Sequence, residues 1–240
     1  MVALKPERLG LDDCADQPVS MCGKSFLAHK SGALYWPAEN ALIVSDLHFE
    51  KGSSFAARGQ LLPPYDTRDT LLKLATVIDF YQAATVIALG DSLHDADAVS
   101  RMNPDDRDAL RFMQDDREWI WITGNHDPAI DKTLGGHVLE QLTVEGITLR
   151  HEPSNGAVSH EIAGHLHPAA RIVLHATGLR RPCFVSNGLR LVMPAFGAFT
   201  GGLNILDAAF EPVFGNDGMA VWMLGQEGLY PIAPRLLHSD

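Results

Sequence analysis

The sequence contains few cysteines and no long apolar stretch. Its 240 residues include three cysteines (Cys14, Cys22 and Cys183), whose spacings match no metal-binding motif and whose odd number argues against a disulfide framework. The longest charge-free window considered as a membrane span, residues 191–206, contains a proline and three glycines and is shorter than a bilayer requires. The N-terminal region has no apolar core of signal-peptide length. We therefore expect a cytoplasmic protein with no membrane partner.

The chain also contains fewer basic than acidic residues. The formal net charge is −11, which disfavours a protein that binds phosphates over its whole surface. The charges are unevenly placed, because residues 91–118 hold nine acids against four arginines, whereas residues 162–206 hold no acid at all. The arginines of this acid-free segment are Arg171, Arg180, Arg181 and Arg190. A local basic site for a polyanionic ligand is therefore still open.

The composition predicts one globular domain over residues 1–240. Hydrophobic residues make up 46% of the chain and charged residues 20%, which suits a protein with a packed core. A chain of this length can form one large domain or two small ones. Glycine and proline are spread along it, and no repeat, low-complexity tract or linker stands out, which favours the single domain.

The first half of the chain alternates strand and helix patterns, and the second half is mostly strands. A hairpin is predicted over residues 25–36, followed by buried strands at 41–44, 85–89 and 119–123. Helices are predicted at 66–81, with Asp66 as N-cap, and at 104–114. A second hairpin is predicted at 137–144 and 147–150, and further strands at 160–164, 170–175, 181–185, 189–193, 219–224 and 228–232. We therefore predict two packed sheets with helices outside, rather than one doubly wound sheet.

Polar side chains follow successive predicted strands at the point where each strand ends. They are Asp46, His48, Asp91, Asn125, His151, His165 and His167. Because the carboxyl ends of such strands meet in one crevice, we expect these side chains to converge. The spacings Asp46-x-His48 and His165-x-His167 would put each pair on one face of an extended segment.

This set of ligands indicates a pair of transition-metal ions. Mixed imidazole nitrogen and carboxylate oxygen suits Mn²⁺, Fe²⁺, Zn²⁺ or Co²⁺ better than Ca²⁺ or Mg²⁺. The ligands are too many for one such ion, but they suit two ions about 3.5–4 Å apart that share a bridging carboxylate.

The order of these motifs resembles the calcineurin-like metallophosphoesterases. Asp-Leu-His at 46–48, Gly-Asp at 90–91, Gly-Asn-His-Asp at 124–127, a lone histidine and Gly-His-Leu-His at 164–167 follow one another in that family's order. The resemblance implies an α/β fold, a four-layer α/β/β/α sandwich of two mixed sheets flanked by helices. It also implies an enzyme that hydrolyses phosphoesters with two divalent metal ions.

The resemblance assigns a role to each residue of the motifs. It implies that the first metal is held by Asp46, His48 and His167. The second metal would be held by Asn125, His151 and His165, and Asp91 would bridge the two. A hydroxide between the metals would attack phosphorus in line, and the catalytic residues would be His126, which protonates the leaving oxygen, and Asp127, which orients the His126 ring.

Two longer stretches narrow the resemblance to the ligase-associated, PdeM-like subgroup of DNA-damage-response phosphodiesterases. They are SDLHFEKGSSFAARG at residues 45–59 and CFVSNGLRLVMPAFGAFTGGLNI at residues 183–205. The subgroup implies a Mn²⁺-dependent phosphodiesterase or endonuclease that acts on DNA in repair. It also implies as partners an ATP-dependent DNA ligase, a helicase and an exonuclease-like protein.

Further residues are candidates for substrate contacts, with a structural alternative for each. His94 follows Asp91 by three residues and could lie near the pocket. The basic candidates are Lys51, Arg58, Arg171, Arg180 and Arg181, which either line the rims of the site or are ordinary solvated side chains. Phe196 and Phe199 either stack on a base or lie in the core.

Two other functions remain open at this stage. A small-molecule phosphomonoesterase or nucleotide pyrophosphatase on the same scaffold would suit the acidic net charge. A non-catalytic scaffold protein that has lost its metals is disfavoured, because every ligand position of the motifs is filled.

Overall fold

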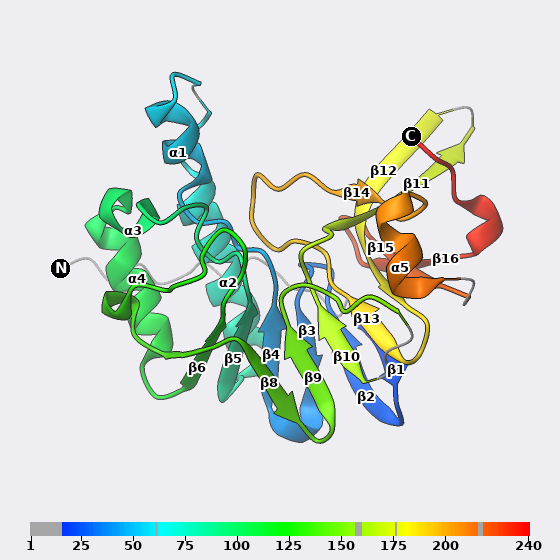
Figure 1. Ribbon diagram of the computed structural model, residues 1–240, viewed down its shortest axis with the longest axis horizontal. Coiled ribbons are helices and arrows are strands. Elements are labelled where there is room, and N and C mark those ends of the chain that lie inside the picture. Colours follow the sequence, from blue (N-terminus) through cyan, green and yellow to red (C-terminus); the bar gives the residue numbers. More distant parts are fainter. Residues whose placement is uncertain (1–15, 61, 157–159, 176, 216–217) are drawn as a thin grey trace.

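The protein consists of two β-sheets that face each other, with helices on their outer sides (Figure 1). The structure is a computed structural model that describes residues 16–60, 62–156, 160–175, 177–215 and 218–240. Cys14 lies outside the described residues, and Cys22 and Cys183 are free thiols. In the part of the chain that is described, no helix is both long and apolar enough to cross a membrane.

The first sheet has seven strands in the order of the sequence. They are β1 (Gln17–Met21), β2 (Lys24–Ala28), β3 (Leu34–Trp36), β4 (Ala41–Val44), β5 (Thr85–Leu89), β6 (Glu118–Ile122) and β7 (His137–Leu139). Strands β1 to β4 pair antiparallel, whereas β4, β5, β6 and β7 pair parallel. The carboxyl ends of the parallel strands therefore lie at one edge of the sheet.

The second sheet is also mixed. Its strands are β8 (Gln141–Val144), β9 (Ile147–Arg150), β10 (Glu161–Ala163), β11 (Pro168–Leu174), β12 (Thr177–Ser186), β13 (Arg190–Val192), β14 (Leu203–Asn204), β15 (Ala220–Leu224) and β16 (Leu229–Ile232). The main path runs β14-β11-β12-β13-β10-β9-β8, and β15 pairs with β12 and β16. The neighbours β9, β10 and β13 run parallel, so their ends also meet at one edge.

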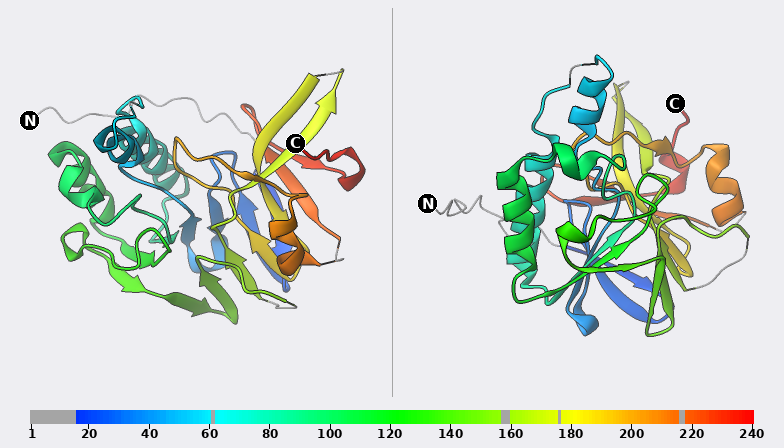
Figure 2. Two further views of the ribbon diagram at one scale, coloured as in Figure 1. Left: turned by 45° about the horizontal axis from the view of Figure 1, so that its top comes forward. Right: turned by 60° about the vertical axis from the view of Figure 1, so that its left-hand side comes forward.

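Helices cover the outer face of each sheet (Figure 2). The outer side of the first sheet carries α2 (Asp66–Tyr81), α3 (Ala98–Arg101) and α4 (Pro104–Gln114), and α1 (Lys51–Ala57) lies beyond the strand ends beside α2 and α3 (Figure 1). The second sheet carries α5 (Glu211–Phe214) on the opposite side of the molecule. Short 3₁₀ turns η1 (Pro37–Glu39), η2 (Lys132–Leu134), η3 (Ala208–Phe210) and η4 (Pro234–Leu236) complete the described elements. The predicted α/β sandwich of two mixed sheets flanked by helices is confirmed.

The apolar runs form strands that are buried on both faces. In β4, Leu42 and Val44 pack towards the helices, and Ile43 packs towards the second sheet. In β6, Trp121 packs towards the helices and Ile122 packs towards the second sheet. Since successive side chains of a strand point to opposite faces, a continuous apolar run is what a strand between two apolar layers requires.

Two details of the predicted elements are wrong. The predicted strand 137–144 is broken at Glu140, and its two parts join different sheets, because β7 pairs with β6 and β8 pairs with β9. Asp66 is the first residue of α2 rather than its N-cap, and its carboxylate accepts the N–H of Gly52 at 2.9 Å. This bond ties the start of α2 to α1, a helix that the sequence pattern did not predict.

Candidate metal centre

Polar side chains from both sheets meet between the ends of the parallel strands. The first sheet contributes residues that follow β4, β5 and β6, namely Asp46, His48, Asp91 and Asn125. The second contributes His151 after β9, and His165 and His167 after β10. The structure thus brings together the side chains that the motifs predicted, in two clusters that each offer three His or Asp ligand atoms within 4.8 Å of one another.

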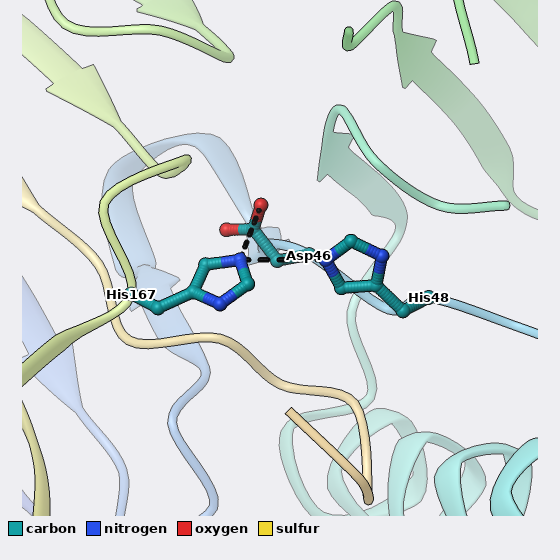
Figure 3. A group of neighbouring side chains, drawn as sticks. All are labelled: Asp46, His48 and His167. Atoms are coloured by element: carbon teal, nitrogen blue, oxygen red, sulfur yellow. Dashed lines mark hydrogen bonds and ion pairs between the residues drawn. The ribbon is translucent and has the colours of Figure 1, made fainter. Parts of the chain in front are cut away.

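The first cluster contains Asp46, His48 and His167, which point towards one another (Figure 3). Asp46 is fully buried and His48 is nearly so. His167 Nε2 lies 3.1 Å from Asp46 Oδ1 and 3.4 Å from His48 Nε2. The Nδ1–H of His167 donates to the Gly201 carbonyl at 3.2 Å, so the lone pair of Nε2 faces the cluster.

The second cluster contains Asp91, His151 and His165, with Asn125 beside them. The Nδ1–H of His151 donates to the Leu89 carbonyl at 3.0 Å, which turns Nε2 towards the other ligands. His151 Nε2 lies 3.0 Å from Asn125 Oδ1, 3.1 Å from His165 Nδ1 and 3.4 Å from Asp91 Oδ1.

Asp91 lies between the two clusters. Its Oδ1 faces His151 of the second cluster, and its Oδ2 lies 4.0 Å from His48 Nε2 of the first. Its Oδ1 also accepts the backbone N–H of His126 at 2.9 Å, which fixes the carboxylate in this orientation. A carboxylate with one oxygen towards each cluster is arranged as a bridging ligand would be.

The backbone at these residues is left-handed rather than extended. The φ angles are 53° at Asp46, 46° at His48, 45° at Asp91, 66° at His165 and 45° at His167. The prediction that the period-two spacings lie in extended segments is therefore wrong, although both members of each pair still face the site. Each such residue costs on the order of 1 kcal/mol, a strain that tends to gather at functional sites.

The two sheets approach so closely at the first cluster that one position accepts only glycine. A Cβ atom on Gly164 would lie 1.7 Å from Ser45 Oγ and 2.5 Å from Asp46 Oδ2. Asp46 Oδ2 accepts hydrogen bonds from Ser45 Oγ and from the amide of His165. Asp46 Oδ1, by contrast, is buried without a hydrogen bond and faces the histidines.

These arrangements fit divalent cations. Asp46 Oδ1 is buried without a hydrogen bond and lies near the ring nitrogens of His48 and His167, so a cation held among these three atoms would meet its charge. Metal–nitrogen bonds of about 2.1 Å place neighbouring ligand atoms about 3.0–3.4 Å apart, which agrees with the spacings within each cluster. The nitrogen and oxygen donors suit Mn²⁺, Fe²⁺, Zn²⁺ or Co²⁺ alike. The paired clusters are consistent with a dinuclear metal site.

Burial and neighbouring charges set the protonation of the ligands. Burial lowers the pKa of His48 to about 3, so its imidazole is neutral and able to bind a cation. Burial opposes ionisation of Asp91, but contact with His151 and the His126 N–H outweighs it and lowers its pKa to about 2. For His151, burial is outweighed by Asp91 and Asp46, which raise its pKa to about 9. Without a cation, a proton on His151 therefore offsets part of the negative charge of Asp46 and Asp91.

His126 and Asp127 play separate parts. The Nδ1–H of His126 donates to the His94 carbonyl at 2.9 Å, and its ring stacks on the His94 ring. Asp127 is buried and accepts the backbone N–H groups of residues 91–93 and 124 at 2.7–3.0 Å. Burial raises the pKa of Asp127 to about 6, against the effect of these bonds. The prediction that Asp127 orients the His126 ring is wrong, because Asp127 holds the loop that carries Asp91.

A cavity of about 310 Å³ opens over the two clusters. Lys51, His94 and His126 line it together with five of the ligands, namely His48, Asp91, Asn125, His165 and His167. Phe55 on α1 also lines it and was missed, because the helix that carries it was not predicted. Arg58, which directly follows α1, is exposed and, in the described part of the chain, does not line this cavity.

The remaining basic candidates lie near the second sheet. Arg180 and Arg181 line a smaller cavity of about 110 Å³ beside His167. Among the described residues, Arg171 lines neither cavity, and it donates to the Ser239 carbonyl at 2.7 Å. Of the two phenylalanines, Phe196 is fully buried in the core and Phe199 is half-buried.

The fold is metallophosphoesterase-like, and the paired clusters are consistent with a dinuclear metal site. Among solved structures, the crystal structure of Pseudomonas putida nuclease MPE aligns with a TM-score of 0.71 and 29% sequence identity, covering 91% of this chain and 100% of that chain. This likeness, the fold and the site support a metal-dependent phosphoesterase.

Two further solved structures are more distant. AQ665, a protein of unknown function from Aquifex aeolicus, aligns with 17% identity and a TM-score of 0.38, covering 53% of this chain and 78% of that chain. The phosphoesterase Yfce from E. coli aligns with 14% identity and a TM-score of 0.42, covering 80% of this chain and 98% of that chain. These two TM-scores are too low to show a common fold. No protein-family model and no curated protein matches the chain.

Proposed function

We propose that the protein is a two-metal phosphodiesterase that cleaves DNA. The observation that carries this proposal is the pair of ligand clusters with Asp91 between them, beneath a cavity whose wall includes His126. Two bound cations would offset the charge of a phosphodiester and lower the pKa of a water molecule between them. The metal we propose is Mn²⁺, by resemblance of the motifs.

The protein's own groups would position the ester and move the proton. The first cation would be held by Asp46, His48 and His167. The second would be held by Asn125, His151 and His165, with Asp91 shared. His126 has its Nδ1–H fixed on the His94 carbonyl, so Nε2 is the ring atom that can exchange a proton with the leaving oxygen. Proton transfer by a positioned imidazole contributes roughly 10²–10⁴-fold to a rate.

Three observations favour a nucleic acid over a small phosphomonoester. The solved structure that aligns over 91% of the chain is named a nuclease. The cavity wall combines a cation, Lys51, with an aromatic ring, Phe55, as sites for nucleotides do. The motif stretches resemble the ligase-associated subgroup, so we place the activity in DNA repair beside a ligase, a helicase and an exonuclease-like protein.

A panel of substrates tests the proposal. Protein loaded with Mn²⁺ is given a 4-nitrophenyl monoester, bis(4-nitrophenyl) phosphate, a dinucleotide and single-stranded DNA, with Asp91→Ala protein as the control. We expect the diesters and DNA to be hydrolysed by the native protein and not by the variant. Hydrolysis of the monoester alone would replace this function with that of a small-molecule phosphatase.

A further inference from the structure

We propose that Phe55 stacks on the base of the nucleoside that leaves when the phosphodiester is cleaved. The protein would then prefer nucleotide esters over diesters that carry no flat ring. This inference rests on the proposed phosphodiesterase function. The side chain of Phe55 lines the larger cavity over the metal clusters, as do His94 and His126.

Phe55 lies outside the apolar clusters that the described residues form, although its side chain is half-buried. Its ring contacts the imidazole of His94, with 5.8 Å between the ring centres and 37° between the planes. Aromatic rings usually bury their faces in a core, where they contribute most to stability. A ring kept at the wall of a polar cavity instead has a surface available for another flat ring, such as a base.

The place of Phe55 in the cavity points to the leaving nucleoside. The His94 ring stacks on the His126 ring, with 5.2 Å between their centres, and the Phe55 ring follows next to His94. His126 is the residue that would exchange a proton with the leaving oxygen. In an in-line displacement the attacking and leaving oxygens lie on opposite sides of phosphorus. A base joined through its sugar to the leaving oxygen is therefore the one nearer to Phe55.

Helix α1 presents Phe55 together with a cation. Lys51 precedes Phe55 by four residues, so the two side chains share one face of the helix, and both line the cavity. None of the ion pairs among the described residues involves Lys51. A nucleotide at this wall would thus meet a ring for its base and a positive charge for its phosphate.

The helix is anchored at its first turn. The carboxylate of Asp66 accepts the N–H of Gly52 at 2.9 Å. The carboxylate of Glu50 accepts the hydroxyls of Ser53 at 2.6 Å and of Thr67 at 2.8 Å. A ring carried by an anchored element loses less conformational freedom when a ligand binds, so this wall is preorganised for stacking.

Removing one base from a short substrate tests the inference. Three dinucleotides are compared with Mn²⁺-loaded protein: one with both bases, and two in which either nucleoside is replaced by an abasic sugar. The fragment released without the phosphate identifies the leaving nucleoside. In the native protein, loss of the base on that nucleoside should lower kcat/KM roughly tenfold. In Phe55→Leu protein this loss should shrink to less than about twofold, since the stacking partner is gone.

Two variants and a metal analysis serve as controls. Phe55→Tyr keeps an aromatic ring and should keep the tenfold loss. Phe112→Leu removes an exposed phenylalanine of α4 and should also keep it. Phe55→Leu protein should hold as much metal as the native protein, because Phe55 belongs to neither ligand cluster.

The outcomes separate this base site from the proposed function. If Phe55→Leu lowered kcat/KM equally for the dinucleotides with and without the leaving base, Phe55 would only support His94, and the base site would be overturned. A tenfold loss that follows the other base, or no loss with either, would also overturn it and leave the phosphodiesterase intact. If the native protein cleaved neither a dinucleotide nor bis(4-nitrophenyl) phosphate, the phosphodiesterase function itself would be overturned.

Discussion

Asp91 is the residue on which both clusters depend. Its carboxylate faces His151 with one oxygen and His48 with the other, and the His126 amide fixes its orientation. A bridging ligand is shared by two cations, so its loss weakens both sites at once.

We therefore expect Asp91→Ala to abolish phosphodiester hydrolysis and to lower the metal content of the purified protein. Metal analysis and hydrolysis of bis(4-nitrophenyl) phosphate measure the two effects. Asp97→Ala, at an exposed carboxylate on the same loop, is the matched control and should retain both metals. A variant at Asp91 with native metal content would mean that the carboxylate is not a bridge.

His126 lines the cavity but belongs to neither ligand cluster, and its Nδ1 is already engaged by the His94 carbonyl. We expect His126→Ala to lower kcat roughly 10²–10⁴-fold while both metals remain bound. His137→Ala, at an exposed histidine of β7, should leave kcat unchanged. Loss of metal from the His126 variant, or a native rate, would contradict its role as the proton donor.

At the scale of residues, the sequence was informative where chemistry restricts the choice of side chain. The ligands could be predicted because few residue types bind transition ions and because they follow strands that end at one edge. The role of Asp127 could not be predicted, since a carboxylate beside a histidine is equally able to bind the ring or the backbone. Only the fold shows that four amides lie nearer to it.

At the scale of elements, the loop that contains Phe196 and Gly197 holds the first cluster in place. The amide of Phe196 donates to the Ser45 carbonyl, and the amide of Gly197 donates to the Asp46 carbonyl. A Cβ atom on Gly197 would lie 2.2 Å from the Leu47 carbonyl oxygen, which is backbone and cannot move aside.

We therefore expect Gly197→Ala to lower the free energy of unfolding by about 2 kcal/mol and to weaken metal binding as well. Urea denaturation and a metal titration measure the two effects. Gly228→Ala is the control, because a Cβ atom there would meet nothing within 4 Å. If the two variants behaved alike, the close contact between the loop and residue 47 would have no energetic importance.

Lys73 on α2 supports the same loop from the other side. Its ammonium donates to the Phe196 carbonyl at 2.6 Å and lies 3.9 Å from the centre of the Phe196 ring. Burial lowers the pKa of Lys73 from 10.5 to about 8. Between these two values the unfolded chain binds more protons than the folded protein, so stability should rise with pH.

The free energy of unfolding of the native protein should therefore depend on pH differently from that of Lys73→Met protein. Below about pH 8 both states are protonated and the native protein carries the full cost of burying the ammonium. From pH 7.5 to 10 it should gain about 2 kcal/mol in free energy of unfolding relative to the variant. Urea denaturation at several pH values measures this, and a constant difference would show that Lys73 is not desolvated.

Elements with a strong periodic pattern could be predicted, and those defined by distant contacts could not. The helices α2 and α4 have an apolar stripe at helical spacing, and β4, β5 and β6 are short apolar runs. Helix α1 has seven residues and is held by Asp66 and Glu50 rather than by its own pattern. The break at Glu140 depends on which sheet each half can reach, which no local pattern encodes.

At the scale of the whole molecule, the metal centre lies between the two sheets. Asp46, His48 and Asp91 come from the first sheet, whereas His151, His165 and His167 come from the second. Bound cations would therefore link the sheets as well as activate the ester. A ligand that binds the folded protein alone stabilises it by about 2.7 kcal/mol at a hundred times its Kd.

Titration of metal-free protein with Mn²⁺ tests the account most directly, with bound metal and hydrolysis of bis(4-nitrophenyl) phosphate followed together. The account predicts two equivalents of Mn²⁺ per chain, a higher melting temperature, and hydrolysis that reaches its maximum only when both equivalents are bound. Binding of fewer than two equivalents, or an equal rate in the metal-free protein, would contradict it.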